Sequence, residues 1–184
     1  MLALAVLCST GVWSQANDPG RFTVESASHE LAGDVYYVDA LISLRLPSEA
    51  LNALHSRVPL TIRVEVELLN RLRLWWDTTA TSARRRSQLE YHPLTDRYVV
   101  RSISNESEEA EGFATLAAAL EFLGRVDHFA VAQADELEEN ERYDIRVRAV
   151  LDRTELPGPL ALLAFWRQDW SIASDWWQWR LDTD

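Results

Sequence analysis

Alternation of apolar and polar residues is the dominant pattern along the chain. In TIRVEVEL, residues 61–68, the apolar side chains fall on every second position and the charged ones between them, as a half-buried β-strand requires. The stretches YDIRVRAVL and VYYVDALISLRL repeat the pattern. Further strands are predicted at 22–29, 72–78, 84–91, 97–103 and 175–181.

Two short helices are predicted between the strands. Ser48 is expected to cap EALNALH at 49–55, and Thr115 to cap LAAALEFL at 116–123 before Gly124 ends that helix. A third helical turn is expected in the LPGPL segment. Many short strands with two or three short helices favour a mainly β fold, an antiparallel β-sandwich of immunoglobulin-like size.

The acidic run NESEEAEG, residues 105–112, separates two patterned stretches and is interpreted as a surface loop. Too few strands lie on either side of it to build two independent cores. The expected organisation is therefore a single β-sandwich domain over residues 17–184.

The first sixteen residues, MLALAVLCSTGVWSQA, are uncharged and end with small residues at the positions that a signal peptidase reads. We interpret residues 1–16 as an export signal and expect a periplasmic protein with no membrane span after cleavage, because this apolar stretch is too short to cross a bilayer. Cys8, the only cysteine, falls within the signal. Leu7 is not the small residue that a lipoprotein signal needs, which argues against lipid anchoring at Cys8.

Charge is distributed unevenly. The formal net charge is −11, no lysine occurs, and residues 105–184 supply the whole excess of acidic groups. Such a surface repels phosphate backbones, which argues against nucleic-acid binding. The run Arg84, Arg85, Arg86 is more typical of a solvated strand or loop face.

No catalytic, metal or cofactor motif is found. The four histidines lie in separate segments without zinc-ligand spacing, and neither a GxSxG elbow nor a glycine-rich phosphate loop occurs. Carboxylates brought together by the fold, as in a hydrolase, remain an alternative. We expect a non-enzymatic protein without a cofactor or bound metal.

Of the eight tryptophans, most are expected to be buried, because indole rings dominate core energetics. Within the predicted strand 175–181, alternation places Trp177 and Trp179 toward the core and Trp176 on the other face. The same argument turns Trp75 outward from the strand at 72–78. Trp75 and Trp176 are thus the predicted partner contacts, together with Arg84, Arg85 and Arg86.

Several blocks of the sequence resemble a known family. The blocks VPLTIRVEVEL, SQLEYHPLTDRYVV, FATLAAALEFLGR, ERYDIRVRAVLDRTELPGPL and DWSIASDWWQW occur in this order over most of residues 58–180. They resemble the exported proteobacterial domain-of-unknown-function family 4390. Genes of this family often lie near one for a membrane histidine kinase of the nitrogen-regulation type, so the resemblance implies an accessory or sensing role in the envelope.

Three functions stay open at this point. The first is binding to another envelope protein, for which the extracytoplasmic part of a sensor histidine kinase is one candidate. The second is binding of glycans or peptidoglycan fragments, in which the same aromatic side chains stack on sugar rings. The third is hydrolysis by carboxylates that the fold gathers.

Overall fold

The computed structural model describes residues 18–71, 78–103, 109–138, 141–152 and 172–181. Two antiparallel sheets form most of this part of the chain, which confirms the mainly β, sandwich prediction. The smaller sheet has the order β1-β2-β7 and the larger the order β6-β5-β4-β3-β8-β9. The strands are β1 Arg21–Ala32, β2 Val35–Arg45, β3 Leu60–Asn70, β4 Thr78–His92, β5 Arg97–Ile103, β6 Ala110–Phe113, β7 Arg125–Gln133, β8 Tyr143–Asp152 and β9 Trp177–Arg180.

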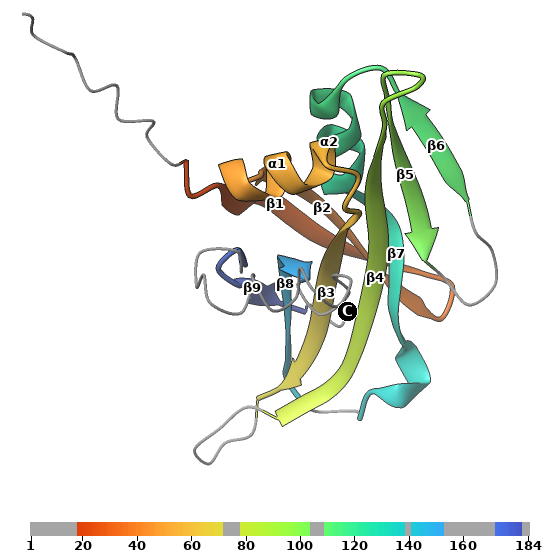
Figure 1. Cartoon of the computed structure of the whole chain (residues 1–184). Coiled ribbons are helices and arrows are strands. Elements are labelled where there is room, and N and C mark those ends of the chain that lie inside the picture. The colour runs from red at the N-terminus through yellow and green to blue at the C-terminus, as the bar shows by residue number, and fades with distance from the viewer. Residues whose placement is uncertain (1–17, 72–77, 104–108, 139–140, 153–171, 182–184) are drawn as a thin grey trace, which may run out of the picture.

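The core lies between the two sheets, which cross at a steep angle in Figure 1. The alternating residues of β3 and β8 meet in register there: Ile62 lies opposite Leu151, Val66 opposite Val147, and all four side chains are buried. Each such side chain contributes about 1.5–3 kcal/mol when it leaves water. The strands predicted from alternation at 61–68 and 143–151 are therefore confirmed.

Two α-helices, α1 Ser48–His55 and α2 Leu116–Gly124, lie near one end of the sandwich (Figure 1), and a 3₁₀ turn, η1, spans Ala134–Glu136. Thr115 caps α2 as predicted, because its hydroxyl accepts a hydrogen bond from the Ala118 N–H at 3.2 Å. The predicted cap at Ser48 is wrong: Pro47 holds the cap position. The Ser48 hydroxyl instead donates to the Asp18 carbonyl at 3.4 Å.

Two strands depart from the prediction. β6 occupies the end of the segment expected to be a loop at 105–112, because it adds to β5 as an edge strand. β7 was not predicted, since a bulge around His128 breaks its alternation. The Asp39 carboxylate accepts a hydrogen bond from the His128 N–H at 2.8 Å, and this holds the residue at φ 49°.

Other predictions fall outside the described residues. They include the signal segment at 1–16, the helical turn in LPGPL and nearly all of the strand at 72–78. Among the helices that the structure describes, none is long and apolar enough to cross a membrane.

Candidate functional site

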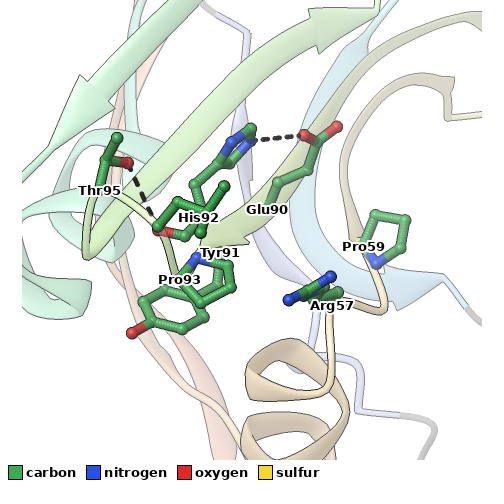
Figure 2. Close-up of a pocket in the computed structure, with 8 residues that line it drawn as sticks. Arg57, Pro59, Glu90, Tyr91, His92, Pro93 and Thr95 are labelled. Carbon is green, nitrogen blue, oxygen red and sulfur yellow. Dashed lines mark hydrogen bonds and ion pairs between the residues drawn. The ribbon is translucent and has the colours of Figure 1, made fainter.

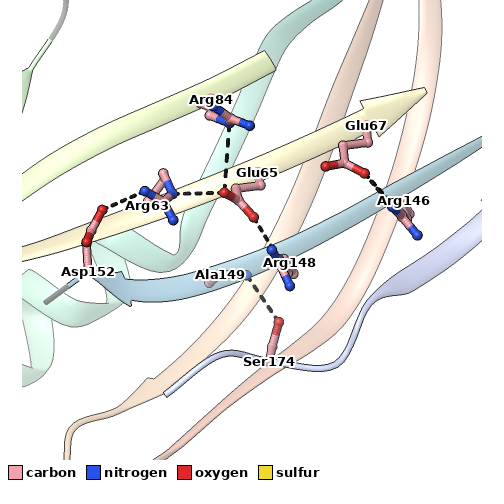
Figure 3. A network of polar contacts seen from close by, with 9 residues as sticks. All are labelled: Arg63, Glu65, Glu67, Arg84, Arg146, Arg148, Ala149, Asp152 and Ser174. Carbon is pink, nitrogen blue, oxygen red and sulfur yellow. Dashed lines mark hydrogen bonds and ion pairs between the residues drawn. The ribbon is translucent and has the colours of Figure 1, made fainter. Parts of the chain in front are cut away.

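A network of ion pairs covers the outer face of the larger sheet, around the centre of β3 (Figure 3). Glu65 is its hub: one carboxylate oxygen lies 2.9 Å from Arg63 Nε, and the other accepts a hydrogen bond from Arg148 Nε at 2.7 Å. Arg84 Nε lies 3.8 Å from the same carboxylate. We call the network the polar ladder, and its members are Arg63, Glu65, Glu67, Arg84, Arg146, Arg148 and Asp152.

Strand register explains why the polar ladder forms. Glu65 lies directly opposite Arg84 of β4 and Arg148 of β8, and Glu67 lies opposite Arg146. Opposite charges at facing positions attract one another across a sheet. The Glu65 side chain is only 6% exposed, so these arginines supply the partners that a buried carboxylate requires.

Trp176 lies against the β8 side of the polar ladder. Its ring centroid is 4.3 Å from Arg146 Cζ and 4.2 Å from Arg148 Cζ, which are cation–π distances. Trp176 is half-buried as a result. The fold thus brings two predicted contact residues into one network, because Glu65 and Arg148 connect Arg84 to Trp176.

Trp177 was expected in the core, and that prediction is wrong: the residue is 41% exposed. It lies opposite the buried Val147, so its side is the one predicted, but β9 is the last strand at this end of the sheet. Trp177 therefore borders a hollow of about 600 Å³ between residues 172–177 and the start of β1. Residues lining this hollow include Arg21, Phe22, Thr23, Ile172, Asp175, Trp176 and Trp177.

Trp179 is only partly buried, although it packs against the core as expected. Its indole Nε1 donates a hydrogen bond to Nδ1 of His29 in β1 at 3.0 Å. This bond connects an edge strand of one sheet to an edge strand of the other.

The three consecutive arginines do not form one patch. Arg84 and Arg86 are exposed on the outer face of β4. Arg85 points to the other side, where its Nη2 donates to the carbonyl oxygens of Leu123 at 2.9 Å and Arg125 at 3.0 Å. Burial lowers the pKa of the Arg85 guanidinium from its ordinary value, and the charge of Asp127 opposes that shift. The other predicted contact, Trp75, lies outside the described residues.

A second hollow, of about 470 Å³, lies beside the turn between β4 and β5 (Figure 2). Leu94 at the tip of this turn is 97% exposed, a feature that alternation could not reveal because the turn is not part of a strand. The Thr95 hydroxyl donates to the His92 carbonyl, and the imidazole of His92 lies 3.1 Å from the Glu90 carboxylate. These polar groups hold the turn together.

Metal-ligating side chains do not gather in the described part of the chain: no group of three or more histidine, cysteine or carboxylate residues there could hold a metal ion. The surface around Trp176 and Trp177 presents aromatic and guanidinium groups. We call it the tryptophan rim, made of Asp175, Trp176 and Trp177 with Arg146 and Arg148, whose guanidinium groups lie over the Trp176 ring.

Comparison with known proteins identifies a family. The model of the family described as Domain of unknown function (DUF4390) matches residues 20–180. The chain belongs to this family, as its sequence blocks indicated. No curated protein and no solved structure matches the chain.

Proposed function

We propose that this member of the DUF4390 family is a non-enzymatic binding protein of the bacterial envelope, and that the tryptophan rim contacts a protein partner. The observation that carries the proposal is the exposure of Trp177, 41%, directly beside the half-buried Trp176. When a partner covers an exposed tryptophan ring, apolar surface leaves water, and this stabilises the complex.

The composition of the rim matches that of energetic centres in protein interfaces. Tryptophan and arginine are among the residues enriched at such centres, and both are present here. Arg148 is bound to Glu65, and Arg146 to Glu67, before any partner arrives. Because their positions are already fixed, these arginines lose less conformational entropy on binding than unpaired arginines would.

The charge of the chain and its expected compartment indicate what kind of partner the rim would bind. The acidic C-terminal half would attract a partner with a basic surface and raise the rate of association. The uncharged, apolar N-terminal segment supports export to the periplasm. A membrane protein with an extracytoplasmic part, such as a sensor histidine kinase, could bind the rim in that compartment.

Glycans or peptidoglycan fragments are the second candidate ligands of the same surface. The hollow next to Trp177 combines an aromatic ring with polar side chains, including Thr23 and Asp175. Stacking on Trp176 is less favourable, because two guanidinium groups already lie over its ring. A sugar would therefore stack on Trp177.

Affinity capture from the organism's own envelope tests the proposal, with Trp177→Ala compared with Leu94→Ala. Leu94 is also exposed but lies outside the rim. We expect one protein to be retained by the wild type and by Leu94→Ala, and retained about tenfold less by Trp177→Ala, the loss typical of an interface centre. Circular dichroism would verify that both variants are folded.

Two outcomes contradict the proposal. One is equal capture by the wild type and Trp177→Ala. The other is a change in tryptophan fluorescence on titration with peptidoglycan fragments that Trp177→Ala abolishes, because it would assign the rim to glycans.

A further inference from the structure

A third hollow, of about 490 Å³, separates α2 from the end of the larger sheet formed by β4, β5 and β6. Ser87 of β4 lies opposite Ser102 of β5, and Val100 of β5 lies opposite Glu111 of β6. Residues that line the hollow are Arg85, Ser87, Val100, Ser102, Glu109, Ala110, Glu111, Phe122 and Leu123. The lining thus contains hydroxyl, apolar, cationic and anionic groups.

Arg85 supplies the positive charge. Its Nη2 is occupied by the carbonyl oxygens of Leu123 and Arg125, which leaves the N–H donors of Nε and Nη1. Among the residues that the structure describes, no carboxylate forms an ion pair with this guanidinium. Burial lowers the pKa of Arg85, but a guanidinium stays charged in proteins, so a half-buried cation borders the hollow.

Glu109 and Glu111 supply the negative charge from the β6 side. Both side chains are exposed, and neither forms an ion pair within the described parts of the chain. β5 lies between β4 and β6, so β4 and β6 run roughly 10 Å apart. Glu109 is in the same cross-strand row as Ser87, two positions along β4 from Arg85, so the backbones that carry Arg85 and these carboxylates are farther apart than the strand spacing. Opposite charges therefore line one hollow without contacting each other.

We infer that this hollow binds a small zwitterion, of which a free α-amino acid is the simplest. Its carboxylate would accept hydrogen bonds from Arg85, and its ammonium group would donate to Glu109 or Glu111. Arg85 and the two glutamates all line the hollow, so a ligand held by a charge-assisted hydrogen bond of about 2.8 Å at each end would connect their charges. The ligand's side chain would lie against Val100 and Phe122, which accounts for a phenylalanine that is 45% exposed.

This inference does not depend on the proposed function, because the hollow and the tryptophan rim share no residue. Arg85 has a structural role as well, since its guanidinium binds the carbonyl groups at the end of α2. A structural role alone does not explain the carboxylates on the other side. Variants on both sides of the hollow distinguish the structural role of Arg85 from a role in ligand binding.

Isothermal titration calorimetry of the purified chain with each of the twenty amino acids at millimolar concentration tests the inference. We expect at least one amino acid to bind, and its Kd to rise about tenfold or more in Arg85→Gln and in Glu109→Gln/Glu111→Gln. The carboxylate variant keeps Arg85 and the end of α2 intact. Arg97→Gln and Glu25→Gln, exposed and outside the hollow, are the matched controls and should leave Kd unchanged.

Analogues with one charge give the sharper readout. Removal of the ammonium group from the bound amino acid should eliminate the effect of the glutamate variant while retaining that of Arg85→Gln. The inference is overturned if no amino acid binds the wild type, or if the folded glutamate variant binds as tightly as the wild type.

Discussion

At the scale of single residues, Glu65 shows how ion pairs can offset the free energy that is lost when a carboxylate is nearly buried. Three arginines surround its carboxylate, and their side chains are between 22% and 56% exposed. The arginines therefore keep contact with water while the carboxylate does not. Removal of the carboxylate at such a position usually lowers the stability of a protein by more than the ion pairs contribute to it. The reason is that the remaining charged side chains are left without their partner.

Tyr143 makes the stability of the folded state depend on pH. Burial is the main cause that raises the pKa of its phenol above the ordinary value, and the hydrogen bond to Glu141 acts in the same direction. The folded state therefore holds this proton more tightly than the unfolded state, and stability declines as pH rises through about 10, the ordinary tyrosine pKa.

We expect Tyr143→Phe to reduce that alkaline loss, since phenylalanine has no proton to release. The measurement is the free energy of unfolding from urea titrations at a series of pH values from neutral to alkaline. The two stability curves should converge as pH rises. Curves that stay parallel would contradict the assignment to Tyr143.

Trp177 shows what alternation can and cannot predict. Alternation placed this residue on the side of β9 that faces the core, and its register opposite Val147 agrees. Whether a side chain on that side is covered depends on what lies above the edge of the sheet. The exposure of Trp177 therefore depends on how β1 packs against β8 and β9. The local sequence pattern does not encode this packing.

At the scale of elements, α2 is fixed to the smaller sheet through a close approach at Gly124. A Cβ atom at this position would lie 2.0 Å from the carbonyl oxygen of Ile42 in β2. The helix can contact β2 this closely because glycine has no side chain. The sequence predicted Gly124 as the end of the helix, and the contact with Ile42 adds a second reason for glycine there.

Gly124→Ala should lower the free energy of unfolding by about 1–3 kcal/mol, because the added methyl group forces the helix and β2 apart. Gly112→Ala in β6 is the matched control: no atom lies within 4 Å of a Cβ built there, so we expect a change below about 0.5 kcal/mol. Chemical denaturation measures both. Equal stabilities for the two variants would show that α2 adapts without cost.

The elements found by sequence are those with a clean alternation or a helix cap. β3 alternates from residue 61 to residue 68, β8 alternates along most of its length, and Thr115 marks the start of α2. β7 was missed because the bulge at His128 breaks its period of two. β6 was missed because its composition is that of a loop, and it forms a strand only by pairing with β5.

At the scale of the whole molecule, the two proposed binding surfaces differ in chemistry and lie at opposite ends of the larger sheet. The tryptophan rim lies at the β8 and β9 end of the larger sheet, and the charged hollow lies at the β5 and β6 end. The sequence indicated one member of the rim, Trp176. Arg85 was predicted as a partner contact, but the hollow that it shares with Glu109 and Glu111 could not be predicted, since only the strand order brings these residues together.

Site-specific photo-crosslinking in living cells tests the central claim, that the tryptophan rim contacts a protein. A photoreactive amino acid would replace Trp177 in one strain and Ala32, exposed at the end of β1, in another. We predict a discrete adduct with one envelope protein from position 177 and none from position 32. A folded protein that gives no adduct from position 177, or the same adducts from both positions, would contradict the claim.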